Sequence, residues 1–450
     1  MVRERAVFLY KRFSVLFLTT LFTFTFYIKS AGAQQWLSNR QYAEGMGVKL
    51  GSSMVFHLGL GVEGGYDSNV YYSRDTQVGA ARLRIAPYFD FATLPPQRMA
   101  ESEGEGKKPS VEFRLGLAGV YEDWFGSDKS LNDRRDFGVM TDLLFILFPY
   151  GKWRLQLDDS FTRTITPPNE SAPYNYTRDY NDAGLGIKFV PGDALSVGLR
   201  YNFNINFYEE KDLRPAGNYQ MHKVQLNSMW KFLPKTAITF DGEFFPFIRD
   251  SDHISGTNIY LADTSYDLNL WLGLVGLFTS KFGVALRGGY TGGFYSGGDE
   301  LDSWLLNAEL RFFTTPMSML RIGFIRDRRP SYFTNYYMRN EGYITYEQLI
   351  KGRVLVSAKV LGSYLQYSTM YEGNPPNLHP CTLVNDPTRT DWYISTLLFA
   401  EYRIRDYVAV NLTLQFDADI TDFEVNAGVY GNIPEQYYKF AGFLGVRAMY

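Results

Sequence analysis

The sequence predicts an all-β fold: a transmembrane antiparallel up-and-down β-barrel of about 18 strands, with 16 as the alternative. Three observations predict it. Side chains alternate between apolar and polar, the alternating segments are long, and the connections between them alternate between short and long. The 450-residue chain also has 17% aromatic residues and 41 Gly, yet it is only 45% hydrophobic. This composition is typical of a β-rich chain that turns half of its side chains toward lipid.

The first 33 residues are predicted to form a signal peptide. Residues 1–12 carry four basic side chains against one acid, and residues 13–28 form an apolar run. Ala31-Gly32-Ala33 supplies the small residues of a signal-peptidase site, so the mature chain is expected to begin at Gln34. The alternative is a membrane anchor, but the apolar run is shorter than the roughly 20 residues that a helical span needs.

Residues 34–52 are predicted to be a periplasmic segment that precedes a barrel at 53–450. Within the barrel region, every second residue from Leu195 to Phe207 is apolar, and the residues between them are polar or Gly. Residues 408–420 repeat the pattern. Because a strand places successive side chains on opposite faces, a period of two predicts two-faced strands. Such an apolar face packs either into a soluble sandwich core or against lipid.

Strand length and connection length separate these two folds. The alternating segments repeatedly reach 12 residues, whereas soluble strands most often have about 5–6 and tilted membrane strands about 9–11. Short turns such as 149–151 alternate with long polar connections such as 370–390, as expected for strands that run up and down between two rims. The predicted strands are 53–66, 79–93, 110–124, 134–148, 152–165, 177–190, 194–208, 218–232, 236–249, 260–279, 282–295, 302–314, 317–327, 334–349, 353–368, 391–404, 407–420 and 438–450. The pattern is weakest in 134–148 and 334–349, which leaves 16 strands open.

Aromatic residues near strand ends predict girdles at the two membrane surfaces. The residues expected there are Trp124, Trp153, Trp230, Trp392, Tyr407 and Tyr450. The last strand also ends on an aromatic residue at the final position, with Gly442, Leu444, Val446 and Ala448 on the same face as Tyr450. This strand resembles the C-terminal strand of outer-membrane proteins, and the resemblance implies recognition by the barrel-assembly machinery.

The polar face of the predicted strands would line a lumen, which is wide enough for water in a barrel of this size. The candidate lumen-lining residues are Arg82, Arg84, Arg114, Arg154, Arg200, Asn202, Asn204, Arg287, Glu309, Arg311, Asp417 and Asp419. Two interpretations apply to each charged residue. It either pairs with an opposite charge in the wall or contributes to a hydrogen-bonding path for a hydrophilic solute. Lumenal Asn, Tyr and Trp residues would suit a sugar chain, because amides and aromatic rings bind carbohydrate without net charge.

Catalytic, metal and nucleic-acid sites are not indicated. One Cys (Cys381) and four scattered His exclude a disulfide framework and a Cys-based zinc site. The net charge of −3 argues against nucleic-acid binding, and the catalytic motifs of hydrolases and phosphate-binding loops are missing from the sequence. His57 and Glu63 share the inward face of the first strand, but no nucleophile accompanies them. We therefore expect neither an enzyme nor a cofactor.

The most distinctive string is Gly61-Val62-Glu63-Gly64-Gly65-Tyr66-Asp67-Ser68-Asn69-Val70, at the end of the first strand. It resembles the first-strand signature G-x-E-x-x-Y-D-S-N-V of a family of β-barrel porins. These porins occur beside loci for exopolysaccharide synthesis and export in didermal bacteria. The resemblance implies an outer-membrane channel for export of a polysaccharide or other hydrophilic solute. The residues also have a purely structural explanation, since Asp, Ser and Asn start turns and paired glycines let a strand bend.

Two other functions stay open: a plugged barrel that acts as a scaffold, adhesin or motility component, and an outer-membrane enzyme. The expected environment in every case is outer-membrane lipid and lipopolysaccharide. Residues 95–109 break the rule of short turns at the periplasmic rim. They are either an insertion without a role, since long loops close at little entropic cost, or a docking segment for a periplasmic partner.

Overall fold

The computed structural model describes residues 47–51, 53–74, 77–94, 109–129, 131, 136–164, 177–209, 217–253, 258–331, 334–375, 377–382, 384–426, 432–434 and 436–450. The predicted signal peptide lies outside these residues, as does the segment 95–108. In the described part of the chain, no helix has the length and hydropathy of a membrane span.

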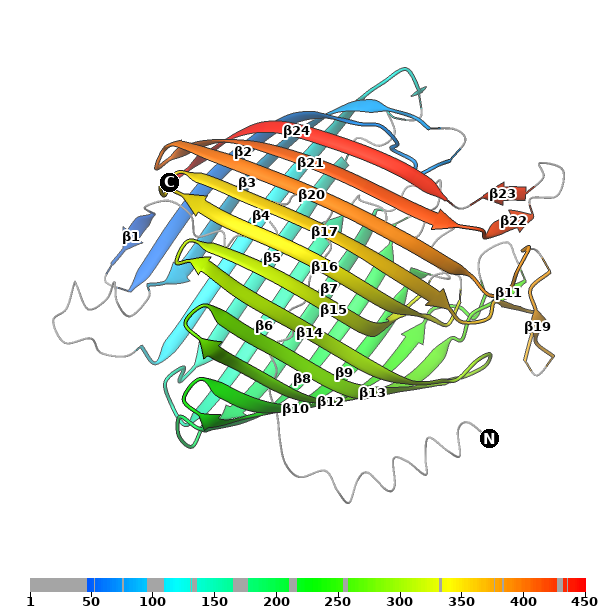
Figure 1. Ribbon diagram of the computed structural model, residues 1–450, viewed down its shortest axis with the longest axis horizontal. Helices are drawn as coiled ribbons and strands as arrows, with labels where there is room; N and C mark the ends of the chain where they lie inside the picture. The colour runs from blue at the N-terminus through cyan, green and yellow to red at the C-terminus, as the bar shows by residue number, and fades with distance from the viewer. Residues whose placement is uncertain are drawn as a thin grey trace.

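Eighteen strands of the described chain form one closed antiparallel barrel, which confirms the predicted fold and the higher strand count (Figure 1). Each strand pairs with its neighbours in the sequence, and the last pairs with the first, Asp67 lying opposite Ala441. The barrel strands are β2 (Met54–Asp67), β3 (Ala80–Thr93), β4 (Val111–Phe125), β5 (Asp136–Leu147), β6 (Trp153–Thr164), β7 (Arg178–Phe189), β8 (Leu195–Tyr208), β9 (Tyr219–Leu233), β10 (Thr236–Arg249), β12 (Thr264–Thr279), β13 (Phe282–Tyr295), β14 (Leu301–Thr315), β15 (Ser318–Pro330), β16 (Tyr336–Ile350), β17 (Val354–Tyr367), β20 (Thr390–Arg405), β21 (Val408–Thr421) and β24 (Tyr437–Met449).

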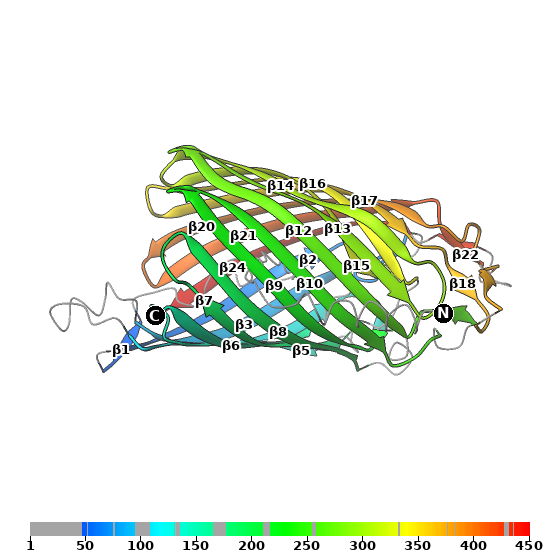
Figure 2. The ribbon, with the colours of Figure 1, turned by 90° about the horizontal axis from the view of Figure 1, so that it is seen from below.

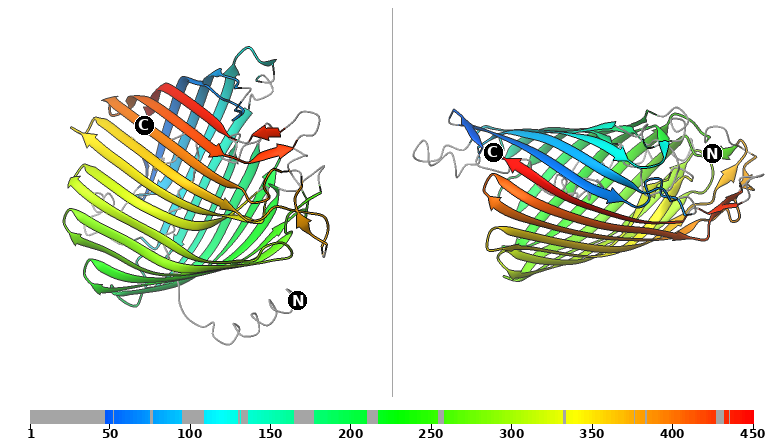
Figure 3. Two further views of the ribbon diagram at one scale, coloured as in Figure 1. Left: turned by 45° about the vertical axis from the view of Figure 1, so that its right-hand side comes forward. Right: turned by 90° about the horizontal axis from the view of Figure 1, so that it is seen from above.

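The short turns gather at one rim and the long connections at the other (Figure 2). At the turn rim, β1 (Val48–Leu50) pairs with the start of β2. At the loop rim, two small sheets lie beyond the barrel (Figure 3). One consists of β11 (Ile259–Tyr260), β18 (Tyr371–Glu372) and β19 (His379–Pro380), and the other of β22 (Glu424–Asn426) and β23 (Asn432–Pro434). The predicted start of β12 at residue 260 is wrong, because Tyr260 pairs with Tyr371 in the first small sheet.

The outer surface of the barrel is predominantly apolar. Leu272 and Leu444, at outward positions of β12 and β24, are 63% and 62% exposed. An exterior of large exposed apolar side chains is compatible with lipid and costly in water, so it identifies the barrel as membrane-spanning. Most of the predicted girdle residues also lie exposed, namely Trp153, Trp230, Trp392, Tyr407 and Tyr450.

Trp124 is the exception, and its predicted place in the girdle is wrong. It is 7% exposed and lies opposite Arg82 of β3. The guanidinium carbon of Arg82 is 4.0 Å from the centroid of its ring, so the indole forms a cation–π contact inside the barrel. The residue sits at an even position of β4, and even positions of this strand face inward. Its place in the alternation therefore decides its direction.

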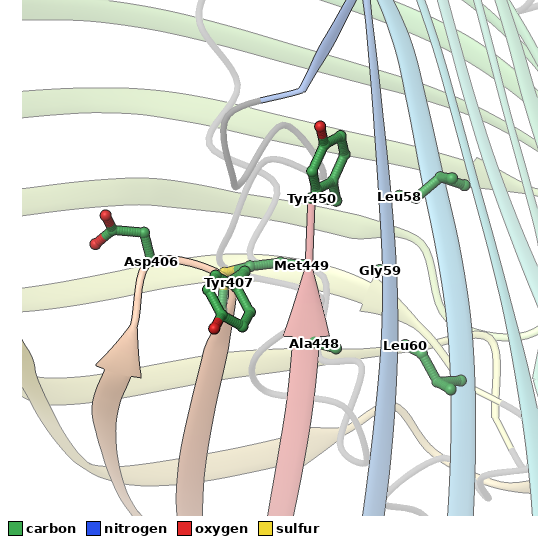
Figure 4. Close-up of a pocket in the computed structure, with 8 residues that line it drawn as sticks. All are labelled: Leu58, Gly59, Leu60, Asp406, Tyr407, Ala448, Met449 and Tyr450. Carbon is green, nitrogen blue, oxygen red and sulfur yellow. The ribbon is translucent and has the colours of Figure 1, made fainter.

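The barrel closes at a seam that leaves a groove on the exterior (Figure 4). The last residue, Tyr450, exchanges two backbone hydrogen bonds with Leu58 of β2, at 2.8 and 3.2 Å. The groove lies beside this point, has a volume of about 580 Å³ and is mostly apolar. Its lining residues are Leu58, Gly59, Leu60, Asp406, Tyr407, Ala448, Met449 and Tyr450. The C-terminal residue is thus part of the strand pairing that closes the barrel.

We expect Leu272→Arg to destabilise the barrel in a bilayer by about 2–4 kcal/mol, the cost of an Arg facing lipid near the midplane. Asn269→Arg, on the lumenal face of the same strand, is the matched control and should change stability much less. Urea unfolding of both variants in lipid vesicles measures the difference. Equal losses at the two positions would contradict the assignment of the faces.

Candidate functional site: the barrel lumen

The alternation of side chains along each strand decides which of them enter the lumen, and the strand register decides which lie opposite one another. Asn202 of β8 lies opposite Lys223 of β9, and Asp241 of β10 lies opposite Trp271 of β12, with all four side chains largely buried. All twelve candidate residues occupy inward positions of this alternation. The structure therefore places them around one enclosed space rather than at a single point.

Near the seam, several charges form a buried network on β2, β3 and β4. Arg82 pairs with Glu122 and lies 3.7 Å from Asp67. Arg84 lies 3.0 Å from Glu122 and 3.6 Å from Glu63. All five side chains are at most 7% exposed. Because an isolated buried charge is strongly unfavourable, such a network holds its members in place in the wall.

Most of the other candidate residues also contact polar groups of the wall. Arg114 is 2.7 Å from Asp90, Arg287 is 3.1 Å from Asp241, and Asp419 is 3.7 Å from Arg389. Arg200 pairs with Asp158 and donates a 2.7 Å hydrogen bond to Asn202, which donates at 2.7 Å to Asp182. The remaining contacts are Arg311 with Glu309, Tyr343 to Glu309 at 2.5 Å, Tyr393 to Asp417 at 3.0 Å, and Arg154 to the carbonyl of Gly151 at 3.3 Å. Asn204 is 1% exposed.

These contacts interleave positive and negative side chains along the wall. Arg447 and Glu401, which are not among the candidate residues, also form an ion pair, with two N–O distances of 2.6 and 2.8 Å. A wall whose charges neutralise one another presents hydrogen-bonding groups without a strong field of either sign.

An apolar cluster that the two-residue period does not predict lies inside the barrel, and we name it the apolar bridge. Tyr88 of β3 and Phe399 of β20 belong to it and are each 4% exposed. Its members are Ala86, Tyr88, Ala118, Val120 and Phe399, with Met140 and Leu355 packed against them. In the sheet, β20 is separated from β3 by β21, β24 and β2. The bridge therefore joins distant parts of the wall through the lumen.

The approach of Tyr88 to the wall depends on Gly59 of β2. A Cβ atom at Gly59 would overlap the Tyr88 ring, with a ring atom 2.0 Å away. Glycine therefore lets the ring lie flat over the neighbouring strand. The sequence carried a signal for the bridge, since Ala86, Ala118 and Val120 interrupt the polar face of β3 and β4. Apolar constrictions can control water and ion passage by dewetting.

At the loop rim, the wall opens between β14 and β15, and the end of the β15–β16 hairpin folds inward. Pairing of β14 with β15 stops at Leu306 and Arg326, although β15 continues to pair with β16 as far as Pro330. Arg326 occupies the opening and donates to the carbonyl of Trp304 at 3.3 Å and to Asn340 at 2.6 Å. It thereby satisfies a backbone group that the missing strand pairing leaves open.

The inward-folded hairpin packs on the inner wall through Arg328. This side chain contacts Asp267 of β12 at 2.6 Å and Tyr295 of β13 at 2.5 Å. Its guanidinium carbon also lies 5.2 Å from the ring centroid of Phe245 on β10. Arg249 adds a 2.8 Å hydrogen bond to the carbonyl of Ser331. These contacts fix the hairpin across part of the loop-rim mouth.

Loops complete the cover of this mouth. Asn335 accepts from the amide of Ala262 and donates to the carbonyl of Gly297, both at 2.9 Å. Tyr371 donates to Asp299 at 2.7 Å. Burial and this carboxylate raise the pKa of the Tyr371 phenol, so it stays a neutral donor. The loops that follow β10, β13, β15 and β17 are thus joined to one another.

In the part of the chain that the structure describes, few observations support metal binding or catalysis. No group of three or more His, Cys, Asp and Glu residues there could hold a metal ion. His57 and Glu63 are both buried, and the imidazole of His57 lies 3.8 Å from the carboxylate of Asp90. Cys381 is buried at 4% exposure beside Met370 and Phe423.

Several solved structures have a similar arrangement of strands. OccK2 (OpdF) of Pseudomonas aeruginosa, in complex with glucuronate, is 11% identical, with 88% of this chain and 98% of that chain covered and a TM-score of 0.46. A BenF-like porin from Pseudomonas fluorescens Pf-5 is 9% identical, with 88% and 99% covered and a TM-score of 0.47. OccAB4 of Acinetobacter baumannii is 10% identical, with 88% and 98% covered and a TM-score of 0.44. No protein-family model and no curated protein sequence matches the chain. Likeness at this level carries no information on the solute.

Proposed function

We propose that this protein is an outer-membrane channel of a didermal bacterium that passes a hydrophilic solute. The observation that carries the proposal is the closed barrel with an apolar exterior and a lumen lined by interleaved charges and amides. Only a closed barrel satisfies all strand hydrogen bonds in lipid, and an enclosed polar path accounts for the many charges that lie inside it.

For the solute, we propose a polysaccharide or its building blocks. The first-strand string Gly61–Val70 supports this through its resemblance to porins of export loci. The mutual neutralisation of the wall charges supports it as well, because it favours a solute without net charge.

The test measures whether sugars block the ionic current through the barrel. The mature chain, residues 34–450, is refolded into planar bilayers, and neutral oligosaccharides are added on one side. If the wild-type lumen conducts, we expect concentration-dependent interruptions of its current. If it does not, we expect them in the variant Tyr88→Ala/Phe399→Ala, in which the apolar bridge is truncated. Block by small organic anions without any block by neutral sugars would contradict the proposed solute.

The apolar bridge favours a second candidate, a non-conducting barrel that acts as a scaffold through its loops. A lumen crossed by buried apolar side chains is consistent with a barrel that passes nothing. The two candidates differ in one result. Truncating the bridge residues would open either barrel to ions, but neutral sugars should then interrupt the current only in a channel that binds them.

Three further features stay proposals: secretion through the signal peptide 1–33, recognition of the strand ending at Tyr450 by the assembly machinery, and docking of a periplasmic partner at residues 95–109. Deleting 96–108 is the simplest check of the third. Loss of export without loss of barrel insertion is the expected result, and unchanged export would remove the docking role.

A further inference from the structure

A polar stripe crosses the outer face of β6, β7, β8 and β9. Its members are Asp159, Asn181, Tyr201 and His222. All four occupy outward positions, since their sequence neighbours Asp158, Asp182, Asn202 and Lys223 belong to the lumenal face. We refer to these four outward residues as the polar stripe.

The stripe consists of two polar contacts on neighbouring strand pairs. Asn181 donates a 2.9 Å hydrogen bond to Asp159 across the β6–β7 pair. The hydroxyl of Tyr201 and Nδ1 of His222 are 2.7 Å apart across the β8–β9 pair. One line of paired residues connects the two contacts, running from Asp159 through Ala183 and Phe203 to His222.

The stripe interrupts an exterior that is predominantly apolar. Asp159 lies near the middle of β6, between the outward residues Leu157 and Phe161, where it would face the hydrocarbon of a bilayer. Ionisable side chains on the lipid face destabilise a barrel most at this depth. Toward the turn rim, the outward residues Trp153 and Leu157 are 57% and 46% exposed, as lipid contact requires.

An ion pair extends the polar outward surface toward the loop rim. Arg163, outward on β6, pairs with Glu209 after β8 at 2.7 Å. The strands β6, β7, β8 and β9 carry the polar stripe. These strands lie together on one side of the barrel (Figure 2). The polar outward residues make this side of the barrel a poor lipid surface.

We propose that the polar stripe is a contact surface for a second copy of this chain. The stripe carries an acid, an amide, a phenol and an imidazole, with Arg163 and Glu209 beside it, so donors and acceptors of both signs share one face. A two-fold axis through such a face sets it against itself, with acceptors of one copy opposite donors of the other. A phosphate-bearing lipid headgroup fits less well, because Asp159 would repel it.

This contact surface does not depend on what the lumen conducts. Its first test uses the variant Ala183→Cys, in the centre of the stripe, on a Cys381→Ser background. Outer membranes that contain this variant are treated with a short bismaleimide. We expect a cross-linked species with twice the chain mass. The variant Thr396→Cys, whose substituted residue is outward on β20, is the matched control and should not cross-link.

The second test removes the polar groups. Asp159→Leu/Asn181→Leu should convert the protein in lipid nanodiscs from two copies to one, as measured by mass photometry, and Thr396→Leu should leave two. The proposal would be overturned if the wild-type protein is a single copy in nanodiscs and the Ala183→Cys variant does not cross-link. Cross-linking of Ala183 to a different protein would also overturn it, since the surface would then serve another partner.

Discussion

Replacing Tyr88 and Phe399 by alanine is expected to open the lumen to ions. The two rings belong to the apolar bridge that joins β3 and β4 to β20. Because apolar constrictions control ion flow by dewetting, their loss should raise single-channel conductance about tenfold or more over wild type. Recording both proteins in planar bilayers at the same salt concentration measures the effect.

The control for this prediction keeps the apolar volume. Tyr88→Phe/Phe399→Leu retains the bridge and should conduct like wild type. If the alanine variant inserts correctly but its conductance does not rise, the bridge is not what limits the lumen.

Breaking the contact between Arg328 and Asp267 is expected to have the second large effect, on stability. Asp267 is 0% exposed and its carboxylate lies 2.6 Å from the guanidinium. Arg328→Met would leave the carboxylate buried without its partner, which costs about 3–5 kcal/mol. Urea unfolding of the refolded barrel measures this loss.

The paired substitution separates the charge effect from packing. In Arg328→Met/Asp267→Leu both charges are gone, and stability should return close to wild type or exceed it, as for other buried ion pairs replaced by apolar residues. The double-mutant cycle then gives a large coupling free energy. An Arg328→Met variant within about 0.5 kcal/mol of wild type, the range of ordinary surface substitutions, would mean that the hairpin is not held by this contact.

The strand pattern could be predicted from the sequence because a single period governs it. Each barrel strand has a lipid side and a lumen side, so the alternation of Leu195 to Phe207 specifies both a strand and its faces. The same rule shows why Trp124 was misplaced. Its position near a strand end favoured the girdle, but its inward place in the alternation decides its contact with Arg82.

The features that shape the lumen depend on contacts between distant segments. The apolar bridge needs Phe399 of β20 beside residues of β3 and β4, and the inward hairpin needs Arg328 beside Asp267. The start of β12 shifts because Tyr260 pairs with Tyr371. None of these partners is adjacent in the sequence or fixed by a period of two, so local patterns cannot predict them. Inward apolar residues such as Ala86 were the local sign of the bridge.

The central claim is that the barrel has water on its inner face and lipid on its outer face. Single cysteines at neighbouring positions of β6, on a Cys381→Ser background, test it most directly. In the variants Gln156→Cys and Ser160→Cys, we expect the thiol to react with a membrane-impermeant reagent. In Leu155→Cys and Leu157→Cys, we expect no such reaction, and a fluorophore attached there should be reached by quenchers embedded in the bilayer. The opposite pattern, with the thiols of Leu155→Cys and Leu157→Cys open to the aqueous reagent and those of Gln156→Cys and Ser160→Cys protected, would contradict this assignment of the two faces.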